Sequence, residues 1–145
     1  MSALNLLRLG RITGNEAWLK RAGTTIEAFG GRLNEYPSIL PQMLVAHDFM
    51  GSTPRQFLIA GKLGRPDTEI MLSMIRKRFL PGKIVLLADG DPGHFLRQYQ
   101  PVLAEIEPQE NKSTVYLCED FSCQLPISDL SEFAKKLEAM EKTPQ

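Results

Sequence analysis

Two short apolar runs, residues 56–60 and 83–88, dominate the middle of the chain. Neither run alternates apolar with polar positions, which is typical of strands covered on both faces, as in a parallel sheet. Between the runs, apolar residues recur at the spacing of a helix: Ile70, Met71, Met74, Ile75 and Phe79. The pattern therefore predicts a strand, a helix and a second strand that lies beside the first.

Helical spacing also predicts helices over residues 3–12 and 16–33, with Asn15 as the N-cap of the second. A third helix is expected to start at a Ser38 cap, with Pro41 in its first turn. Later segments predict a helix over 93–106 interrupted by Pro101, a strand over 114–118, and a last helix capped by Asp129.

These elements predict an α/β fold: a small three-stranded, mainly parallel sheet with flanking helices, preceded by a helical segment. We expect two parts, a helical segment over residues 1–52 and an α/β domain over 53–145, because the Gly-Ser-Thr-Pro stretch at 51–54 ends the third helix.

Composition narrows the possible partners. The 145 residues carry 17 basic and 17 acidic side chains, so no overall charge favours nucleic acid or an anionic membrane. No apolar run approaches the roughly 18 residues that a membrane helix needs. Two cysteines are too few for a disulfide-based scaffold, which indicates a cytoplasmic protein.

The order of several short motifs adds a family resemblance. Residues 5–9, the turn at 12–15, Arg78-Phe79-Leu80-Pro81, and the loop at 118–126 with Cys118 and Cys123 follow one another as in a known family. The chain resembles the C-terminal region of thioredoxin-domain-containing proteins similar to bacterial YyaL and the animal spermatogenesis-associated homologues.

The resemblance implies a longer parent protein with a thioredoxin-like domain, a six-hairpin α/α barrel and an α/β tail. Residues 1–52 would then be the end of the barrel and 53–145 the tail. It implies a non-catalytic structural or interaction region with no cofactor. Its partner would be the remainder of the parent protein or a second copy of the chain. The alternative is a part of a sugar-processing or thiol-redox enzyme whose active residues lie outside this chain.

Cys118 and Cys123 are the best candidate site. They flank a four-residue loop after a predicted strand, at the expected carboxyl edge of a parallel sheet, where α/β proteins place ligands. Three interpretations are open: two unlinked thiols in a packed loop, a redox-active disulfide, or two of four zinc ligands. The resemblance favours a role for the pair, because this loop is the most recognisable part of the family's tail.

Other polar positions have simpler explanations. The loop at 61–67 joins a strand to a helix, where phosphates bind, but it matches no nucleotide motif, and Asp67 is expected to be an N-cap. Asp89 and Asp91 belong to a turn sequence. His47 is expected in the core, and His94 in a solvated loop.

Overall fold

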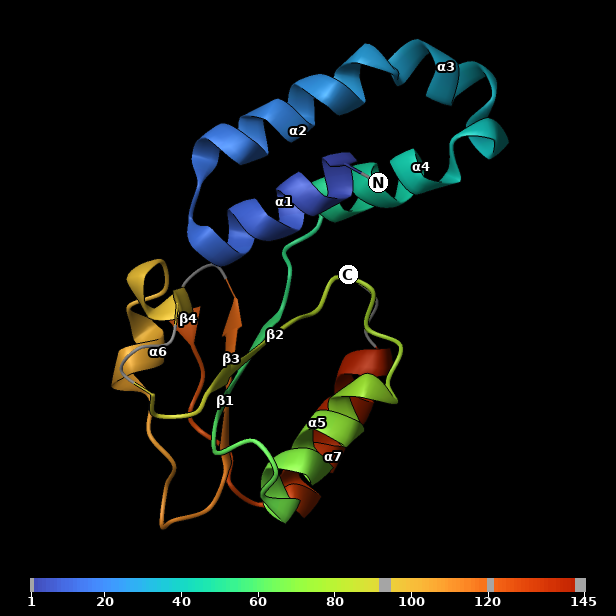
Figure 1. Ribbon diagram of the computed structural model, residues 1–145. Coiled ribbons are helices and arrows are strands. Elements are labelled where there is room, and N and C mark those ends of the chain that lie inside the picture. Colours follow the sequence, from blue (N-terminus) through green and yellow to red (C-terminus); the bar gives the residue numbers. More distant parts are fainter. Residues whose placement is uncertain (1, 92–94, 120–121, 143–145) are drawn as a thin grey trace. The chain divides into compact units, whose positions relative to one another are not determined.

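The computed structural model describes residues 2–91, 95–119 and 122–142. The chain forms two compact units, Met1–Thr53 and Pro54–Gln145. We refer to them as the helical unit and the α/β unit. Figure 1 shows their elements along the chain.

The helical unit consists of four α-helices and one short 3-10 helix within its described residues. They are α1 (Ser2–Thr13), α2 (Glu16–Ala28), α3 (Gly30–Glu35), η1 (Pro37–Ile39) and α4 (Pro41–Gly51). Helix α1 packs against both α2 and α4. Its buried residues, such as Leu4 and Leu7, supply this contact.

The turn between α1 and α2 forms as the sequence predicts. Gly14 has a φ of +66°, which favours glycine, and Asn15 is the N-cap of α2. The Asn15 Oδ1 accepts a hydrogen bond from the Trp18 backbone N–H at 3.1 Å. Gly10 then lets the two helices approach, because a Cβ there would lie 2.6 Å from Leu19 Cδ2.

Two helix predictions in this unit are wrong in detail. The helix expected over 16–33 is broken at Phe29, immediately before Gly30 and Gly31, whose helix propensity is poor. Ser38 lies inside η1, so it does not cap α4. Leu40 occupies that N-cap position because Pro41, which has no N–H to satisfy, is the first residue of the helix.

The α/β unit contains a four-stranded sheet and the remaining helices. Its elements are β1 (Gln56–Ala60), α5 (Pro66–Arg76), β2 (Ile84–Ala88), η2 (Phe95–Gln98), α6 (Val102–Glu105), β3 (Thr114–Glu119), β4 (Ser122–Cys123) and α7 (Leu130–Lys142). The strand order is β2-β1-β3-β4. The predicted α/β fold is confirmed, as is the parallel pairing of β1 with β2.

The third strand makes the sheet mixed, because β3 pairs with β1 in the antiparallel direction. A parallel β3 would need a crossover that carries the chain back to the opposite edge of the sheet. The described part of the connection has only four residues in η2 and four in α6, the latter starting after Pro101. A four-residue helix rises about 6 Å, whereas a five-residue strand spans about 17 Å. The helices of this connection are thus too short to cross the sheet by themselves, and β3 starts at the edge where β2 ends.

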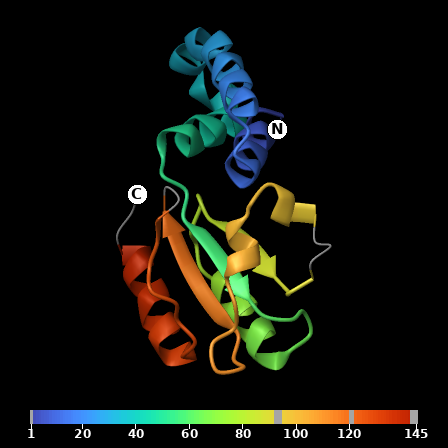
Figure 2. The same cartoon turned by 90° about the vertical axis from the view of Figure 1, so that its left-hand side faces the viewer.

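Helices cover both faces of the sheet, as Figure 2 shows. On one face, buried residues of β1 and β3 form a hydrophobic cluster with α5 and α7. In this cluster the rings of Phe57 and Phe133 meet edge-on with centroids 6.5 Å apart. Helix α6 lies against β2 and contributes the buried Leu103. The continuous apolar runs in β1 and β2 follow from this two-sided burial.

Helix α5 is shorter than the apolar pattern predicts. It ends at Arg76, so Phe79 leaves the helical register and is exposed, and Ile70 also lies on the exposed side. Arg78 instead connects the end of α5 to α7, with its Nη1 2.8 Å from Glu141 Oε2. At the start of α7, Asp129 Oδ1 accepts the Glu132 backbone N–H at 2.8 Å, which confirms the predicted cap.

Candidate functional site: the Cys118–Cys123 disulfide

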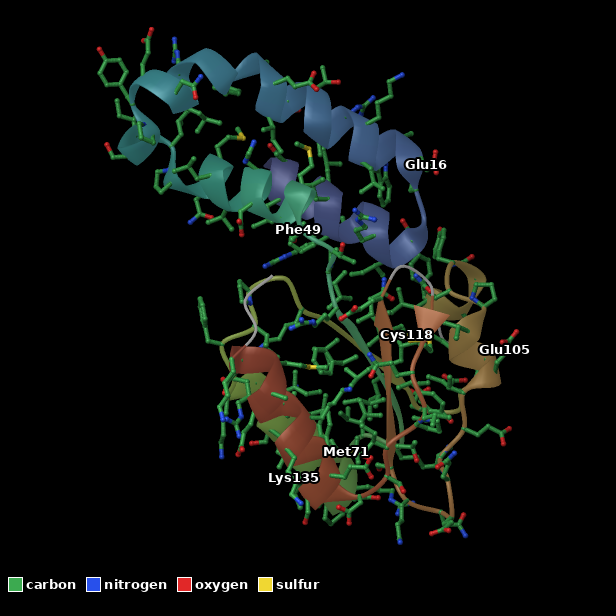
Figure 3. The ribbon with its side chains drawn as sticks, turned by 180° about the vertical axis from the view of Figure 1, so that it is seen from behind. Glu16, Phe49, Met71, Glu105, Cys118 and Lys135 are labelled. Atoms are coloured by element: carbon green, nitrogen blue, oxygen red, sulfur yellow. A yellow bond between two sulfur atoms is a disulfide. The ribbon has the colours of Figure 1, made fainter. Side chains whose placement is uncertain are left out.

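Cys118 and Cys123 are joined by a disulfide. They lie directly opposite each other in β3 and β4, with Cα atoms 4.0 Å apart. The neighbouring residues Leu117 and Gln124 are joined by a hydrogen bond from the Gln124 N–H to the Leu117 carbonyl oxygen, at 2.7 Å. The two cysteines therefore occupy a non-hydrogen-bonded pair, where opposing Cα atoms approach most closely. Figure 3 labels Cys118 in its strand.

The position of the pair differs from the expectation. Cys118 is in register with Gln56, the first residue of β1. Because β3 is antiparallel, its end lies at the amino ends of the parallel strands, away from the carboxyl edge where α/β folds usually bind ligands. The prediction that the cysteines lie at the carboxyl edge is therefore wrong. It failed because it assumed a parallel third strand.

The two cysteines differ in their access to solvent. Cys118 is only 3% exposed, whereas Cys123 is an exposed residue of the edge strand. Beside them, Glu119 pairs with Arg55, whose Nε lies 2.9 Å from Glu119 Oε1. Leu125, two residues after Cys123, is exposed as well. The site thus presents one reachable cysteine and one buried cysteine.

The carboxyl edge of β1 is instead filled by a buried polar contact. Thr68 and Ser113 are both buried, and their hydroxyl oxygens are 2.6 Å apart. Gly61 follows β1 and passes against them, since a Cβ on Gly61 would lie 2.6 Å from Ser113 Oγ. This arrangement leaves no space for a phosphate close to the backbone of Gly61.

Asp67 ties the first turn of α5 to the residue before β3. Its Oδ2 accepts the Ser113 backbone N–H at 2.8 Å, and Arg65 donates to both carboxylate oxygens at 3.1 and 3.2 Å. The Ser113 N–H is the main cause that lowers the Asp67 pKa to about 2, with Arg65 contributing. Asp67 is not the predicted N-cap, because Arg65 occupies that position before Pro66. The carboxylate stands where an anionic ligand would be expected.

A small cavity of about 280 Å³ lies beside Asp67, between the start of β3 and the starts of α5 and α7. It is lined by Asp67, Met71, Lys112, Ser113, Ser128, Asp129 and Leu130. Both carboxylates already accept hydrogen bonds, Asp67 from Ser113 and Asp129 from Glu132. The cavity therefore carries no distinctive ligand chemistry.

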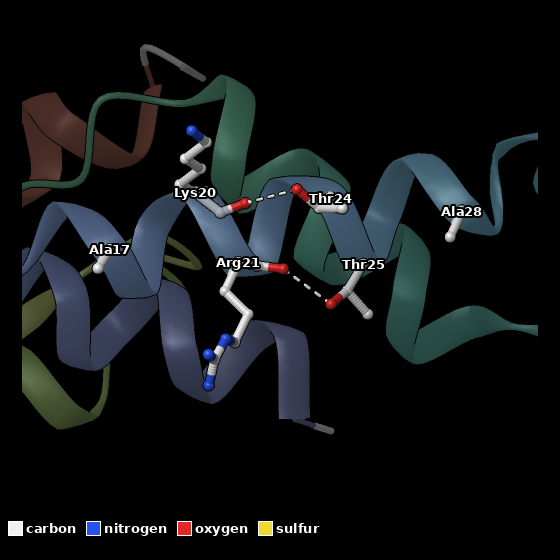
Figure 4. A pocket seen from close by; sticks show the side chains of 6 residues that line it. All are labelled: Ala17, Lys20, Arg21, Thr24, Thr25 and Ala28. Carbon is white, nitrogen blue, oxygen red and sulfur yellow. Dashed lines mark hydrogen bonds between the residues drawn. The ribbon is translucent and has the colours of Figure 1, made fainter.

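A shallow hollow of about 590 Å³ runs along α2 (Figure 4). It is lined by Ala17, Lys20, Arg21, Thr24, Thr25 and Ala28. The Thr24 and Thr25 hydroxyls donate to the backbone carbonyls of Lys20 and Arg21, at 3.1 and 2.8 Å. Four of the six lining residues, the two alanines and the two threonines, have short side chains.

The remaining candidates have structural explanations or lie outside the described residues. Asp89 Oδ1 accepts the Asp91 N–H at 2.9 Å, so the predicted turn is confirmed there. His47 is exposed on α4, so the prediction of a core histidine is wrong. His94 lies outside the described residues.

No group of three or more His, Cys, Asp or Glu side chains among the described residues could hold a metal ion. None of their helices combines the length and the apolar character needed to cross a membrane. Both cysteine sulfurs are already used in the disulfide.

Comparison with known proteins gives a clear relationship. Spermatogenesis-associated protein 20 of Rattus norvegicus is 36% identical over 137 residues, and the Homo sapiens protein is 35% identical over the same length. Both alignments cover 94% of this chain. This chain is homologous to a region of spermatogenesis-associated protein 20. The family resemblance inferred from the motif order is thereby confirmed.

The relationship covers only part of those relatives. The chain spans 17% of the length of the rat and human proteins, and it also aligns with 17% of an uncharacterized protein of Caenorhabditis elegans at 29% identity. No protein-family model matches the chain, and no solved structure gives a significant match. Its homologues thus carry this region within a much longer polypeptide.

Sequence reasoning missed the contact between Thr68 and Ser113, and the bond from Ser113 to Asp67. These residues are 45 and 46 positions apart, and only the antiparallel register of β3 brings them together. One signal was available in Gly61, because a glycine directly after a buried strand often marks a close approach of another segment.

Proposed function

We propose that this chain is a non-catalytic packing and partner-contacting region of a longer protein. The observation that carries the proposal is the apolar surface of α4 and η1, formed by Ile39, Leu44 and Val45, which we call the α4 face. Ile39 is 69% exposed, Leu44 39% and Val45 46%. Two other residues of α4, Ala46 and Phe49, are buried. Covering such exposed apolar side chains with a partner removes apolar surface from water, which is favourable.

The occupant that we propose for the α4 face is the rest of the longer polypeptide. The relatives support this choice, because their chains hold roughly five times as much additional sequence around the homologous region. The resemblance adds that the neighbouring segment is an α/α barrel, of which the helical unit would be the last part. A thioredoxin-like domain, and any sugar-processing or thiol-redox chemistry, would lie in the rest of the protein. We also propose a cytoplasmic location, which the low number of cysteines supports.

The α2 hollow supports the same proposal from a second side of the helical unit. Its short side chains would let a neighbouring helix lie close to the α2 backbone. Lys20 and Arg21 would then meet acidic residues of that helix. Both exposed surfaces of the helical unit thus favour helices as the packing partner.

A binding titration tests the proposal. The 145-residue chain is titrated with the remaining polypeptide of the longer protein, and the same titration is repeated with Leu44→Glu. Loss of one buried leucine contact together with burial of a charge exceeds about 1.4 kcal/mol, so affinity is expected to fall at least tenfold. Leu63→Glu is the matched control, because Leu63 is an exposed leucine in the α/β unit.

Two results would contradict the proposal. One is binding that both leucine variants weaken equally. The other is self-association of the isolated chain through the α4 face, detected by light scattering and abolished by Leu44→Glu, because it would assign the face to a second copy.

A further inference from the structure

We propose that the Cys118–Cys123 disulfide is an exchangeable redox link, with Cys123 as the sulfur that an incoming thiolate attacks. The class of partner is a dithiol, either small or carried by a protein. This inference is independent of the packing role proposed for α4, because both cysteines lie in the α/β unit.

The unequal exposure of the two cysteines gives the link a direction. Thiol–disulfide exchange needs an attacking thiolate to reach one sulfur, and access to that sulfur limits the rate. Cys123 lies on the edge strand and is exposed, whereas Cys118 is buried between β1 and β4. Attack therefore occurs at the Cys123 sulfur, and Cys118 is the leaving group.

The disulfide is also not part of the hydrophobic cluster that packs the sheet against α5 and α7. The hydrophobic cluster between the sheet and helices α5 and α7 includes neither cysteine. Cys118 lies on the other face of the sheet, since its neighbour Leu117 belongs to that cluster and successive side chains alternate. The disulfide closes a loop with a sequence separation of only five residues. Breaking it changes the β4 hairpin and leaves the cluster in place.

Backbone hydrogen bonds to β3 hold the residues that follow β4. The Gln124 N–H donates to the Leu117 carbonyl oxygen at 2.7 Å, and Val115 and Ile127 exchange two backbone hydrogen bonds of 2.9 Å. These bonds do not depend on the sulfurs. Reduction therefore releases the two-residue strand β4 locally, with the segment from Gln124 onward still anchored.

The exchange balances in two steps. The thiolate of the dithiol forms a bond to the Cys123 sulfur, the Cys118–Cys123 bond breaks, and Cys118 leaves as a thiolate that takes up a proton. The second thiol of the partner, after losing its proton, then attacks the mixed disulfide. Cys123 leaves as a thiol after protonation, and the partner becomes a disulfide. The protein gains two electrons and two protons, and the dithiol loses the same number.

Leu125 offers an exposed apolar contact to a protein that carries a dithiol. This side chain is exposed two residues from Cys123, in a segment anchored through Gln124. Burying an exposed leucine in a complex contributes favourable free energy, and here it would position the partner beside the reactive sulfur. The exposed residues Cys123 and Leu125 together define the docking point.

Single-cysteine variants of the full chain test the direction of attack. Cys118→Ser leaves only Cys123, and Cys123→Ser leaves only Cys118. The thiol of the first variant is expected to react with 5,5′-dithiobis(2-nitrobenzoic acid) at least tenfold faster than that of the second. Equal rates, or a faster Cys118, would overturn the proposal.

A second measurement uses the wild-type chain and does not depend on the folding of the variants. Dithiothreitol reduction at neutral pH is followed by rapid alkylation and mass spectrometry, over a series of low urea concentrations. The expected rate is independent of urea, because the native protein itself exchanges. A rate that rises with urea in parallel with global unfolding would overturn the proposal. With glutathione, the trapped mixed disulfide is expected on Cys123; its appearance on Cys118 would have the same consequence.

Discussion

The antiparallel placement of β3 can be tested through Asp67, because the loss of its charge should change the unfolding free energy of the α/β unit. Its carboxylate binds the Ser113 N–H, which precedes β3, at 2.8 Å, and so joins α5 to that strand. In the variant Asp67→Asn the amide oxygen can still accept this bond, but the charge is lost. The variant is therefore expected to be less stable at neutral pH, by the part of the interaction that depends on the charge.

The size of this effect follows from the pKa of Asp67. Folding lowers the pKa from 3.8 to about 2, which corresponds to at most about 2.4 kcal/mol at 1.36 kcal/mol per unit. The side chain is 28% exposed, so solvent screening reduces the expected contribution to about 1–1.5 kcal/mol. Because the folded pKa is lowered, the stabilisation is present above pH 3.8 and is lost as the pH falls towards 2.

The assay must report on the α/β unit alone. Hydrogen exchange of the β1 and β3 peptides along a urea series, read by mass spectrometry, gives its unfolding free energy at pH 7 and near pH 2.5. Asp67→Asn is expected to lower this value by about 1–1.5 kcal/mol at pH 7 and by much less near pH 2.5. Glu105→Gln removes an exposed negative charge from α6, in the same unit, and is the control. An equal loss at both pH values, or none at pH 7, would refute the reasoning.

Two further substitutions test local packing and capping. Gly61→Ala places a Cβ 2.6 Å from the buried Ser113 Oγ and is expected to destabilise the α/β unit by about 1–3 kcal/mol in urea unfolding. The control Gly31→Ala, with nothing within 4 Å, is expected to be neutral or stabilising; equal losses would contradict the packing argument. Asp129→Ala removes the acceptor of the Glu132 N–H and is expected to cost about 0.5–2 kcal/mol, measured by thermal unfolding. An unchanged midpoint would mean that the cap contributes nothing.

The features predicted correctly from the sequence are mostly local ones. The caps at Asn15 and Asp129 depend on residues three positions away, and both are present. The two apolar runs correctly predicted strands. Both faces of β1 and β2 are covered, and strands of this kind have continuous apolar sequences. The parallel pairing of β1 with β2 follows from the helix between them.

The features that the sequence did not predict depend on contacts between distant residues. The direction of β3 is set by its pairing with β1, more than 50 residues earlier in the chain, and the apolar pattern over 93–106 also overstated the helix before it. The location of Cys118 depended in turn on the direction of β3. His47 and Phe79 fit an apolar helical pattern, but exposure is decided by which face finds a neighbour within the chain. The pattern cannot supply that information.

The α4 face, in our proposal, packs against the remainder of a longer protein. Hydrogen exchange of the α4 peptide, Pro41–Gly51, tests it most directly when the isolated chain is compared with the same residues in the longer protein. Exchange is expected to be at least tenfold slower in the longer protein, with unchanged exchange in β1. Equal exchange of α4 in both would contradict it.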